Sequence, residues 1–233
     1  MIQLRQLPKA VIFDVDGTLY DQSSLRRKML GDLVFHLMRS PFTGIRTIKT
    51  LAVFRRLREQ MPDMKVDNLA KVQYHLAADL LRCTAGEVHA IVDEWMFKRP
   101  LHHLRACKLE YLDDFLKFLR SNGITTAVFS DYPAAQKIES LGLNFFLVLD
   151  AEDRRVDLLK PDPKGLMVCA GVLGLEPSAC LFIGDRDDRD GECARRAGMP
   201  FLLYARSSCS TLNTFNSYQQ LPGAFSTAHN QPN

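Results

Sequence analysis

Five short apolar runs divide this chain into the repeating units of an α/β fold. They are AVIF (10–13), TTAVFS (125–130), FFLVL (145–149), CLFIG (180–184) and PFLLYA (200–205). Runs of this length and composition are typical of strands that are buried on both faces of a parallel sheet. From Leu109 onward they alternate with helix-like segments, so the sequence predicts βαβ crossovers and a doubly wound parallel sheet.

The helix-like segments between these runs carry recognisable start and stop residues. LEYLDDFLKFLRSNG (109–123) has leucines at three- and four-residue steps and ends at its glycine. DPKGLMVCAGVLG begins with Asp162, which we expect as the N-cap, and Pro163, which we expect at the first helical position. GECARRAGMP is expected to end its helix at Gly198.

The block from residue 22 to residue 108 differs from the rest of the chain. It contains helical patterns and no convincing strand. We interpret such a block, inserted after the first strand of an α/β domain, as an all-helical cap. The sequence thus predicts an α/β core (1–21 and 109–205), a helical cap (22–108) and a polar tail (206–233). We expect the tail to dock loosely or to be disordered.

Composition and charge narrow the class of protein. The chain has 233 residues and a net charge of +3, which is too small to indicate a nucleic-acid partner. No apolar run reaches the ~18 residues of a membrane-spanning helix, and the N-terminus lacks the apolar core of a secretion signal. Six scattered cysteines without a C-x-x-C pair favour reduced thiols over disulfides or a zinc site. We therefore expect a cytoplasmic protein that contacts neither membrane nor nucleic acid.

Two aspartates, Asp14 and Asp16, directly follow the first apolar run. Residues two apart in an extended segment point to the same side, so the two carboxylates are expected to converge, and Gly17 then allows a sharp turn. Carboxylates this close acquire unequal pKa values unless a cation intervenes, which suits one as nucleophile and the other as acid and base. An isolated D-x-D is more often a turn with two solvated acids.

Three further strand ends favour the chemical interpretation. Ser130 ends the second run and offers a hydroxyl for a phosphate oxygen, while Lys160 precedes a proline-initiated helix and offers a positive charge. Asp185 follows the fourth run and opens an acidic loop, RDDRD (186–190). Carboxylates from this loop and from the first strand would form an oxygen-rich site suited to Mg²⁺.

These motifs resemble those of the haloacid dehalogenase-like (HAD) hydrolase superfamily. The resemblance covers most of residues 9–205: DVDGTL (14–19) matches motif I, Ser130 motif II, Lys160 motif III and GDRDDRD (184–190) motif IV. A helical block between motifs I and II occupies the C1 cap position of that superfamily. The resemblance implies a Mg²⁺-dependent phosphatase with a helical cap, in the phosphoglycolate phosphatase-like branch.

Residue by residue, the resemblance implies distinct roles. Asp14 would attack phosphorus and form an aspartyl-phosphate. Asp16 would protonate the leaving group and then activate water. Ser130 and Lys160 would bind the phosphoryl group.

The metal is expected at motif I and motif IV. Asp14, Asp185 and the backbone carbonyl of Asp16 would hold Mg²⁺. Because residue 189 is arginine, the second acid of motif IV fits the longer spacing and is assigned to Asp190. Arg186 stands where many members carry a small hydroxyl residue. The acids at positions 187 and 188 are expected to face solvent or to order the loop.

The substrate is expected to be a small phosphorylated metabolite. The segment from Tyr20 to Glu110 contains sixteen Lys or Arg residues and ten Asp or Glu residues, so the cap is basic. Most of these charges are expected to be solvated. A phosphomutase similar to β-phosphoglucomutase is an alternative, and a non-catalytic binding protein on the same scaffold is another. A haloacid dehalogenase is disfavoured because that branch lacks the second acid that Asp16 provides.

Overall fold

The computed structural model describes residues 6–64, 68–206 and 213–229. Its centre is a six-stranded sheet of order β3-β2-β1-β4-β5-β6 in which all the pairs are parallel. The strands are β1 (Ala10–Phe13), β2 (Thr125–Ser130), β3 (Leu147–Asp150), β4 (Cys180–Gly184), β5 (Phe201–Tyr204) and β6 (Thr214–Phe215). The predicted doubly wound parallel sheet is confirmed.

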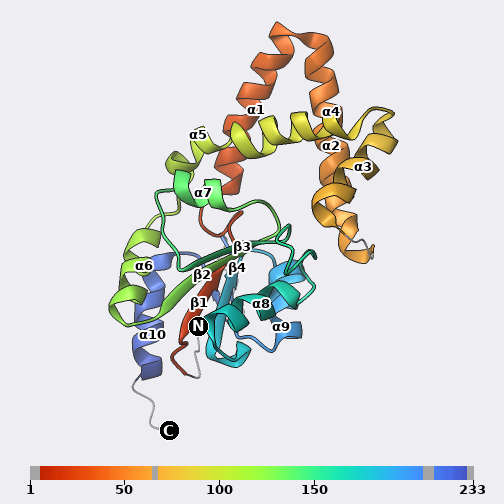
Figure 1. Ribbon diagram of the computed structural model, residues 1–233. Helices are drawn as coiled ribbons and strands as arrows, with labels where there is room; N and C mark the ends of the chain where they lie inside the picture. Colours follow the sequence, from red (N-terminus) through yellow and green to blue (C-terminus); the bar gives the residue numbers. More distant parts are fainter. Residues whose placement is uncertain (1–5, 65–67, 207–212, 230–233) are drawn as a thin grey trace.

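Side chains of β1 supply both hydrophobic cores because successive residues point to opposite faces. Val11 and Phe13 belong to one core, and Ala10 and Ile12 belong to the other. Helices α6 (Leu112–Ser121) and α10 (Leu221–His229) lie on the first face, and α8 (Lys164–Leu173) and α9 (Glu192–Ala197) lie on the second (Figure 1). The short helix α7 (Ala135–Ser140) follows β2.

The cap is helical throughout its described residues, as predicted. Its helices are α1 (Gln22–Arg39), α2 (Pro41–Gln60), α3 (Leu69–Leu81), α4 (Ala85–Val92) with the π-helical turn Asp93–Lys98, and α5 (Leu101–Leu104). Figure 1 shows α1 and α2 as a hairpin that rises from the core, crossed by α4 and α5. The two connections to the core run side by side, because Asp21 N donates to Cys107 O (2.8 Å) and Leu109 N donates to Leu19 O (3.1 Å). The boundaries between core and cap as separate domains stay a prediction.

Several of the expected element starts shift by a few residues, as two examples show. Strand β3 begins at Leu147 rather than Phe145. Helix α8 begins at Lys164, so Pro163 precedes the helix instead of occupying its first position. The N-cap is therefore Pro163 and not Asp162 as predicted, although Asp162 Oδ1 accepts a hydrogen bond of 2.9 Å from Lys164 N.

The expectation of a loosely docked polar tail is wrong for the residues from 213 onward that the structure describes. Strand β6 extends the sheet beside β5, and Tyr218, Leu221 and Phe225 are buried in the same core as α6. The Tyr218 hydroxyl also donates to the carbonyl of Thr18, which lies within motif I (2.9 Å). A few apolar and aromatic residues spaced along a polar segment are enough to dock it, although the average composition conceals them.

The structure bears on two further expectations. Cys83, Cys107, Cys169, Cys180 and Cys193 are free thiols, and Cys209 lies outside the described residues. Within the described ranges, no helix combines the length and apolar character needed to cross a membrane.

Candidate active site

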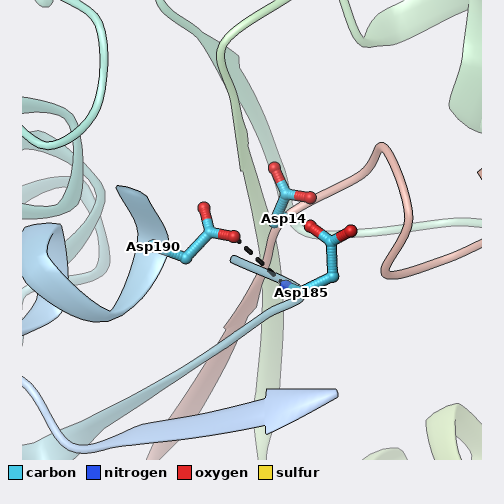
Figure 2. A group of neighbouring side chains, drawn as sticks. All are labelled: Asp14, Asp185 and Asp190. Atoms are coloured by element: carbon cyan, nitrogen blue, oxygen red, sulfur yellow. Dashed lines mark hydrogen bonds between the residues drawn. The ribbon is translucent and has the colours of Figure 1, made fainter. Parts of the chain in front are cut away.

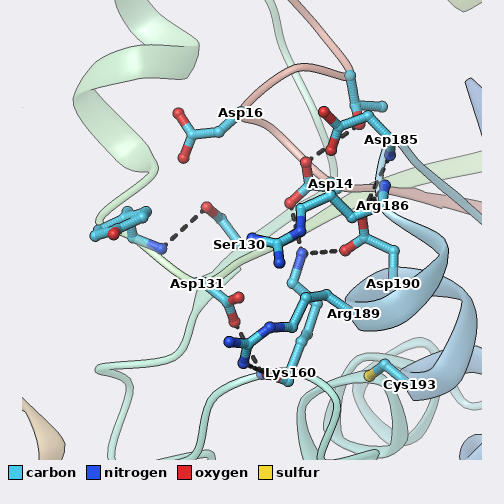
Figure 3. Close-up of polar contacts among 12 residues, drawn as sticks. Asp14, Asp16, Ser130, Asp131, Lys160, Asp185, Arg186, Arg189, Asp190 and Cys193 are labelled. Atoms are coloured by element: carbon cyan, nitrogen blue, oxygen red, sulfur yellow. Dashed lines mark hydrogen bonds and ion pairs between the residues drawn. The ribbon is translucent and has the colours of Figure 1, made fainter. Parts of the chain in front are cut away.

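The site lies at the carboxyl edge of the sheet, where three neighbouring strands end. Asp14 follows β1, Ser130 ends β2 and Asp185 follows β4, and β1 pairs with both other strands. Lys160 reaches the same place from the segment before α8, and Asp190 from the π-helical turn Asp187–Gly191 (Figure 3). The parallel sheet therefore gathers residues that are far apart in the sequence.

Three carboxylates form a compact cluster at this edge. One oxygen from each of Asp14, Asp185 and Asp190 lies within 4.8 Å of the others (Figure 2). Asp190 is held in place because its Oδ2 accepts hydrogen bonds from the backbone N–H groups of Asp185 (3.1 Å) and Arg186 (3.0 Å). Such a set of carboxylate oxygens has the chemistry that a hard divalent cation prefers.

Lys160 is the cation of this cluster. Its Nζ lies 2.6 Å from Asp14 Oδ1 and 2.5 Å from Asp190 Oδ1, and its side chain is only 3% exposed. Burial lowers the pKa of Lys160, but the facing carboxylates outweigh it and raise that pKa well above its usual value. For Asp14, burial acts in the opposite direction and raises the pKa well above its usual range, although the positive charge of Lys160 works to lower it. The lysine thus offsets the repulsion among the acids.

Ser130 and its neighbour Asp131 shape the second side of the site. The buried Ser130 Oγ accepts a hydrogen bond of 3.2 Å from the backbone N–H of Tyr132. Asp131 Oδ1 accepts one of 2.9 Å from the backbone N–H of Lys160 and so holds the segment that delivers the lysine. We did not select Asp131 from the sequence, although it directly follows a motif residue.

The two aspartates of motif I do not converge as predicted. Figure 3 shows the Asp16 carboxylate pointing away from that of Asp14. Strand β1 ends at Phe13, so both acids lie beyond its end, just before the turn at residues 17–19, where the alternation of strand side chains no longer applies. Only Asp14 of the pair contributes a side chain to the cluster of three carboxylates.

Asp16 instead has its own two partners. Lys137 Nζ lies 2.7 Å from each of its carboxylate oxygens, and the Tyr20 hydroxyl donates to Oδ1. Burial raises the pKa of Asp16, but the charge and hydrogen bonds of Lys137 and Tyr20 outweigh it and hold the pKa below its usual value. Tyr20 is therefore a buried residue of the site.

The acidic loop behaves as the sequence predicted. Asp187 and Asp188 are exposed and pair with arginines, Asp187 with Arg195 (3.0 Å) and Asp188 with Arg186 (2.8 Å). These ion pairs order the loop. Of the acids in this loop, Asp185 and Asp190 belong to the carboxylate cluster, and Asp187 and Asp188 do not.

Arg186, the unusual residue of this loop, also connects core and cap. Its guanidinium lies 3.0 Å from Glu59 of α2, and Arg189 lies 3.0 Å from the same carboxylate. Arg189 also donates to the carbonyl of Lys160 (2.8 Å). One cap glutamate is therefore bonded to the loop that carries Asp190 and, through Arg189, to the segment of the lysine.

The cap and the core enclose a cavity of about 560 Å³ above the carboxylates. Asp14, Asp16 and Lys160 form its floor. Its cap side is mostly apolar and includes Leu25, Met29, Leu33, Leu51, Trp95 and Met96. Trp95 is thus both buried and part of the cavity wall.

Gly17 is the position where a single methyl group should disrupt the site. Its φ is +99°, and a Cβ there would lie 2.0 Å from Asp185 Oδ2. We expect Gly17→Ala to displace Asp185, to lower the free energy of unfolding by about 1–2 kcal/mol and to reduce activity at least about 100-fold. The measurements are urea unfolding and steady-state kinetics.

Gly31→Ala is the matched control, because Gly31 lies in α1 with no neighbouring atom within 4 Å of the added Cβ. It should keep full activity and gain up to about 1 kcal/mol from the better helix propensity of alanine. Equal effects of the two substitutions would contradict the assignment of Gly17 as the close neighbour of Asp185.

An acidic site with a buried lysine, at the carboxyl edge of a doubly wound sheet and beneath a helical insertion, is typical of a capped hydrolase with a Rossmann-like core. The sequence model of one hydrolase family, haloacid dehalogenase-like hydrolase, matches residues 8–198. The chain belongs to this family.

Its curated relatives include phosphatases at low identity. A glyceraldehyde 3-phosphate phosphatase of Methanopyrus kandleri is 28% identical over 198 residues, covering 82% of this chain and 81% of that protein. A phosphoglycolate phosphatase of Pseudomonas aeruginosa is 24% identical over 202 residues, covering 83% of this chain and 68% of that protein.

Solved structures show the same fold. A 2-haloacid dehalogenase of Pseudomonas syringae has a TM-score of 0.65 at 22% identity, covering 97% of this chain and 99% of that one. A putative HAD-hydrolase of Bacillus subtilis bound to magnesium has a TM-score of 0.67 at 14% identity, covering 95% and 100%. At these identities the likeness concerns the fold alone.

Proposed function

We propose that the protein is a Mg²⁺-dependent phosphatase that hydrolyses a phosphate monoester through an aspartyl-phosphate on Asp14. The observation that carries the proposal is the cluster at the carboxyl edge, where a buried lysine contacts Asp14 and Asp190 beside Asp185. A nucleophile, a fixed positive charge and a set of oxygen ligands are the three components that phosphoryl transfer requires. The phosphatase relatives support the reaction class.

In the first half of the reaction, Asp14 attacks phosphorus. A carboxylate oxygen of Asp14 forms a bond to phosphorus while the bond from phosphorus to the ester oxygen breaks. Asp16 must carry a proton for this step, against the Lys137 and Tyr20 bonds that favour its carboxylate form, and it donates that proton to the leaving oxygen, which departs as an alcohol. Lys160 and Ser130 bind the phosphoryl oxygens and offset the charge that develops there.

In the second half, water regenerates the enzyme. Asp16 accepts a proton from a water molecule whose oxygen attacks phosphorus, and the bond between phosphorus and Asp14 breaks. Inorganic phosphate leaves and Asp14 is again a free carboxylate. Lys137 and Tyr20 hold the Asp16 side chain throughout by their bonds to its carboxylate.

The residues present fit a divalent cation, because three carboxylates meet within 4.8 Å and supply hard oxygen ligands. Asp14, Asp185 and Asp190 would hold Mg²⁺, with the backbone carbonyl of Asp16 as a further ligand. When bound, the ion would supply charge stabilisation for the phosphoryl oxygens.

Removal of the metal tests this proposal directly. With p-nitrophenyl phosphate as substrate, we expect EDTA to lower the rate of phosphate release at least about 1000-fold. Excess Mg²⁺ should restore the rate. Full activity in EDTA would exclude the metal. If a sugar phosphate is instead isomerised without release of inorganic phosphate, the protein is a phosphomutase and not a phosphatase.

A further inference from the structure

The tip of the α1–α2 hairpin, residues 30–48, carries an exposed apolar surface that the proposed chemistry does not use. Seven of the thirteen large hydrophobic side chains exposed in the described residues lie in this tip: Leu30, Val34, Phe35, Met38, Phe42, Ile45 and Ile48. Met38 is 77% and Phe42 91% exposed. Concentrated apolar exposure of this kind marks an interaction site.

Helix periodicity arranges the hairpin tip as two continuous stripes. In α1, Leu30, Val34 and Met38 follow one another at four-residue steps, and in α2, Phe42 and Ile45 continue at a three-residue step. Figure 1 shows the turn between the two helices as the part of the cap farthest from the sheet. The turn between the two helices therefore projects away from the core.

The two helices that carry this apolar surface are basic. Helices α1 and α2 together contain nine Lys or Arg residues and two Asp or Glu residues. In the tip and directly next to it, Arg39 and Lys49 are exposed, and no ion pair joins either of them to another described residue, whereas Arg46 pairs with Glu87. Apolar side chains flanked by unpaired cations match the chemistry of an anionic lipid surface. The apolar side chains would contact the acyl chains, and the cations would contact the phosphate groups.

We propose that the hairpin tip docks peripherally on an anionic phospholipid bilayer. A symmetric contact between two copies of this chain would bring the same basic helices together, and like charges at an interface are repulsive. Anionic lipid instead neutralises them. The proposal departs from the sequence-based expectation of no membrane contact, which was drawn from the lack of a spanning segment and of a secretion signal.

The apolar surface of the tip continues into the cavity over the carboxylates. Leu30, 60% exposed, and Ile48, 39% exposed, belong both to the tip and to the cavity wall. Leu33, which also belongs to the tip, and Leu51 and Trp95 add to the same apolar lining. A path of this kind suits a phosphate ester whose apolar body lies in the bilayer. The inference about the substrate rests on the proposed phosphatase function, whereas the docking does not.

The docking is tested by co-sedimentation of the full chain with vesicles of phosphatidylcholine and phosphatidylglycerol (7:3). We expect the wild-type protein to bind these vesicles, and high salt or pure phosphatidylcholine to weaken binding. The double variant Met38→Ser/Phe42→Ser should bind at least about tenfold more weakly. Neither residue lines the cavity, so hydrolysis of p-nitrophenyl phosphate should be unchanged.

The matched control is Met167→Ser/Phe146→Ser, which removes a methionine and a phenylalanine that are 48% and 71% exposed on the core. It should bind vesicles like the wild type. Equal loss in both double variants, or no vesicle binding by the wild type, would overturn the proposal. So would a wild-type dimer in sedimentation velocity that only Met38→Ser/Phe42→Ser converts to a monomer, because the tip would then be an interface between copies.

The substrate class is tested with two phosphate esters that share one head group. We expect kcat/KM for oleoyl lysophosphatidic acid in phosphatidylcholine vesicles to exceed that for glycerol 3-phosphate at least about tenfold. Hydrolysis of p-nitrophenyl phosphate combined with an equal or lower kcat/KM for the lipid ester would overturn the substrate inference alone. Lack of hydrolysis of all three esters in the presence of Mg²⁺ would instead overturn the proposed function.

Discussion

Replacement of Asp14 by asparagine is expected to lower kcat/KM for p-nitrophenyl phosphate by at least about four orders of magnitude. The amide cannot form the acyl-phosphate bond, so the covalent route is lost and only binding and electrostatic effects remain. The fold should persist, since the amide is nearly isosteric and Thr18 Oγ1, 3.1 Å from Asp14 Oδ2, can still bond to the side chain. Steady-state kinetics and circular dichroism together separate the two effects.

Asp188→Asn is the matched control for this substitution. Asp188 lies in motif IV beside the site, but it is exposed and pairs only with Arg186. Its loss should change kcat/KM less than about threefold, as expected for a surface ion pair. If Asp14→Asn retains wild-type activity, Asp14 is not the nucleophile and the aspartyl-phosphate route is wrong.

Replacement of Lys160 by methionine should have the second-largest effect, on both stability and activity. It leaves the buried carboxylates of Asp14 and Asp190 without their cation. Removal of one partner of a buried ion pair typically costs about 3–5 kcal/mol, so urea unfolding in EDTA should show a loss of this order. Activity with Mg²⁺ should fall at least about 1000-fold because the charge that faces the phosphoryl oxygens is gone.

Lys117→Met controls for the loss of a positive charge as such. Lys117 is exposed and lies 3.6 Å from Asp114, so its replacement should change the unfolding free energy by less than about 1 kcal/mol. Added Mg²⁺ should recover part of the stability lost in Lys160→Met, since an ion that binds only the native state stabilises it. An unfolding free energy equal to that of the wild type would show that Lys160 does not balance the buried acids.

Much of the core architecture was predictable because it depends on local patterns. Strands β1, β2 and β4 coincide with apolar runs read from the sequence, and they are the strands that carry Asp14, Ser130 and Asp185. Buried parallel strands are continuous apolar runs, so their positions in the sequence can be predicted without knowing which strands lie beside them. The helical insertion was equally visible, since 3.6-residue periodicity differs from that of strands.

Other parts of the fold were hidden from the sequence. Strand β6 has only two residues, Thr214 and Phe215, and pairs only with β5. Its formation depends on a partner already in place, which no local pattern reveals. The burial of Tyr218 and Phe225 likewise depends on the surface that α6 presents.

Within the site, motif residues were predictable and their partners were not. The sequence alone determined that acids, a serine and a lysine follow the strands, because parallel strands all end at one edge. Only the tertiary structure decided that Asp16 turns to Lys137, 121 positions later, while Asp14 joins Asp185 and Asp190. Which side chains meet depends on packing among elements that are distant in the sequence. The apolar hairpin tip is likewise a property of the tertiary structure, because only the packed fold determines which apolar side chains of a helix stay exposed.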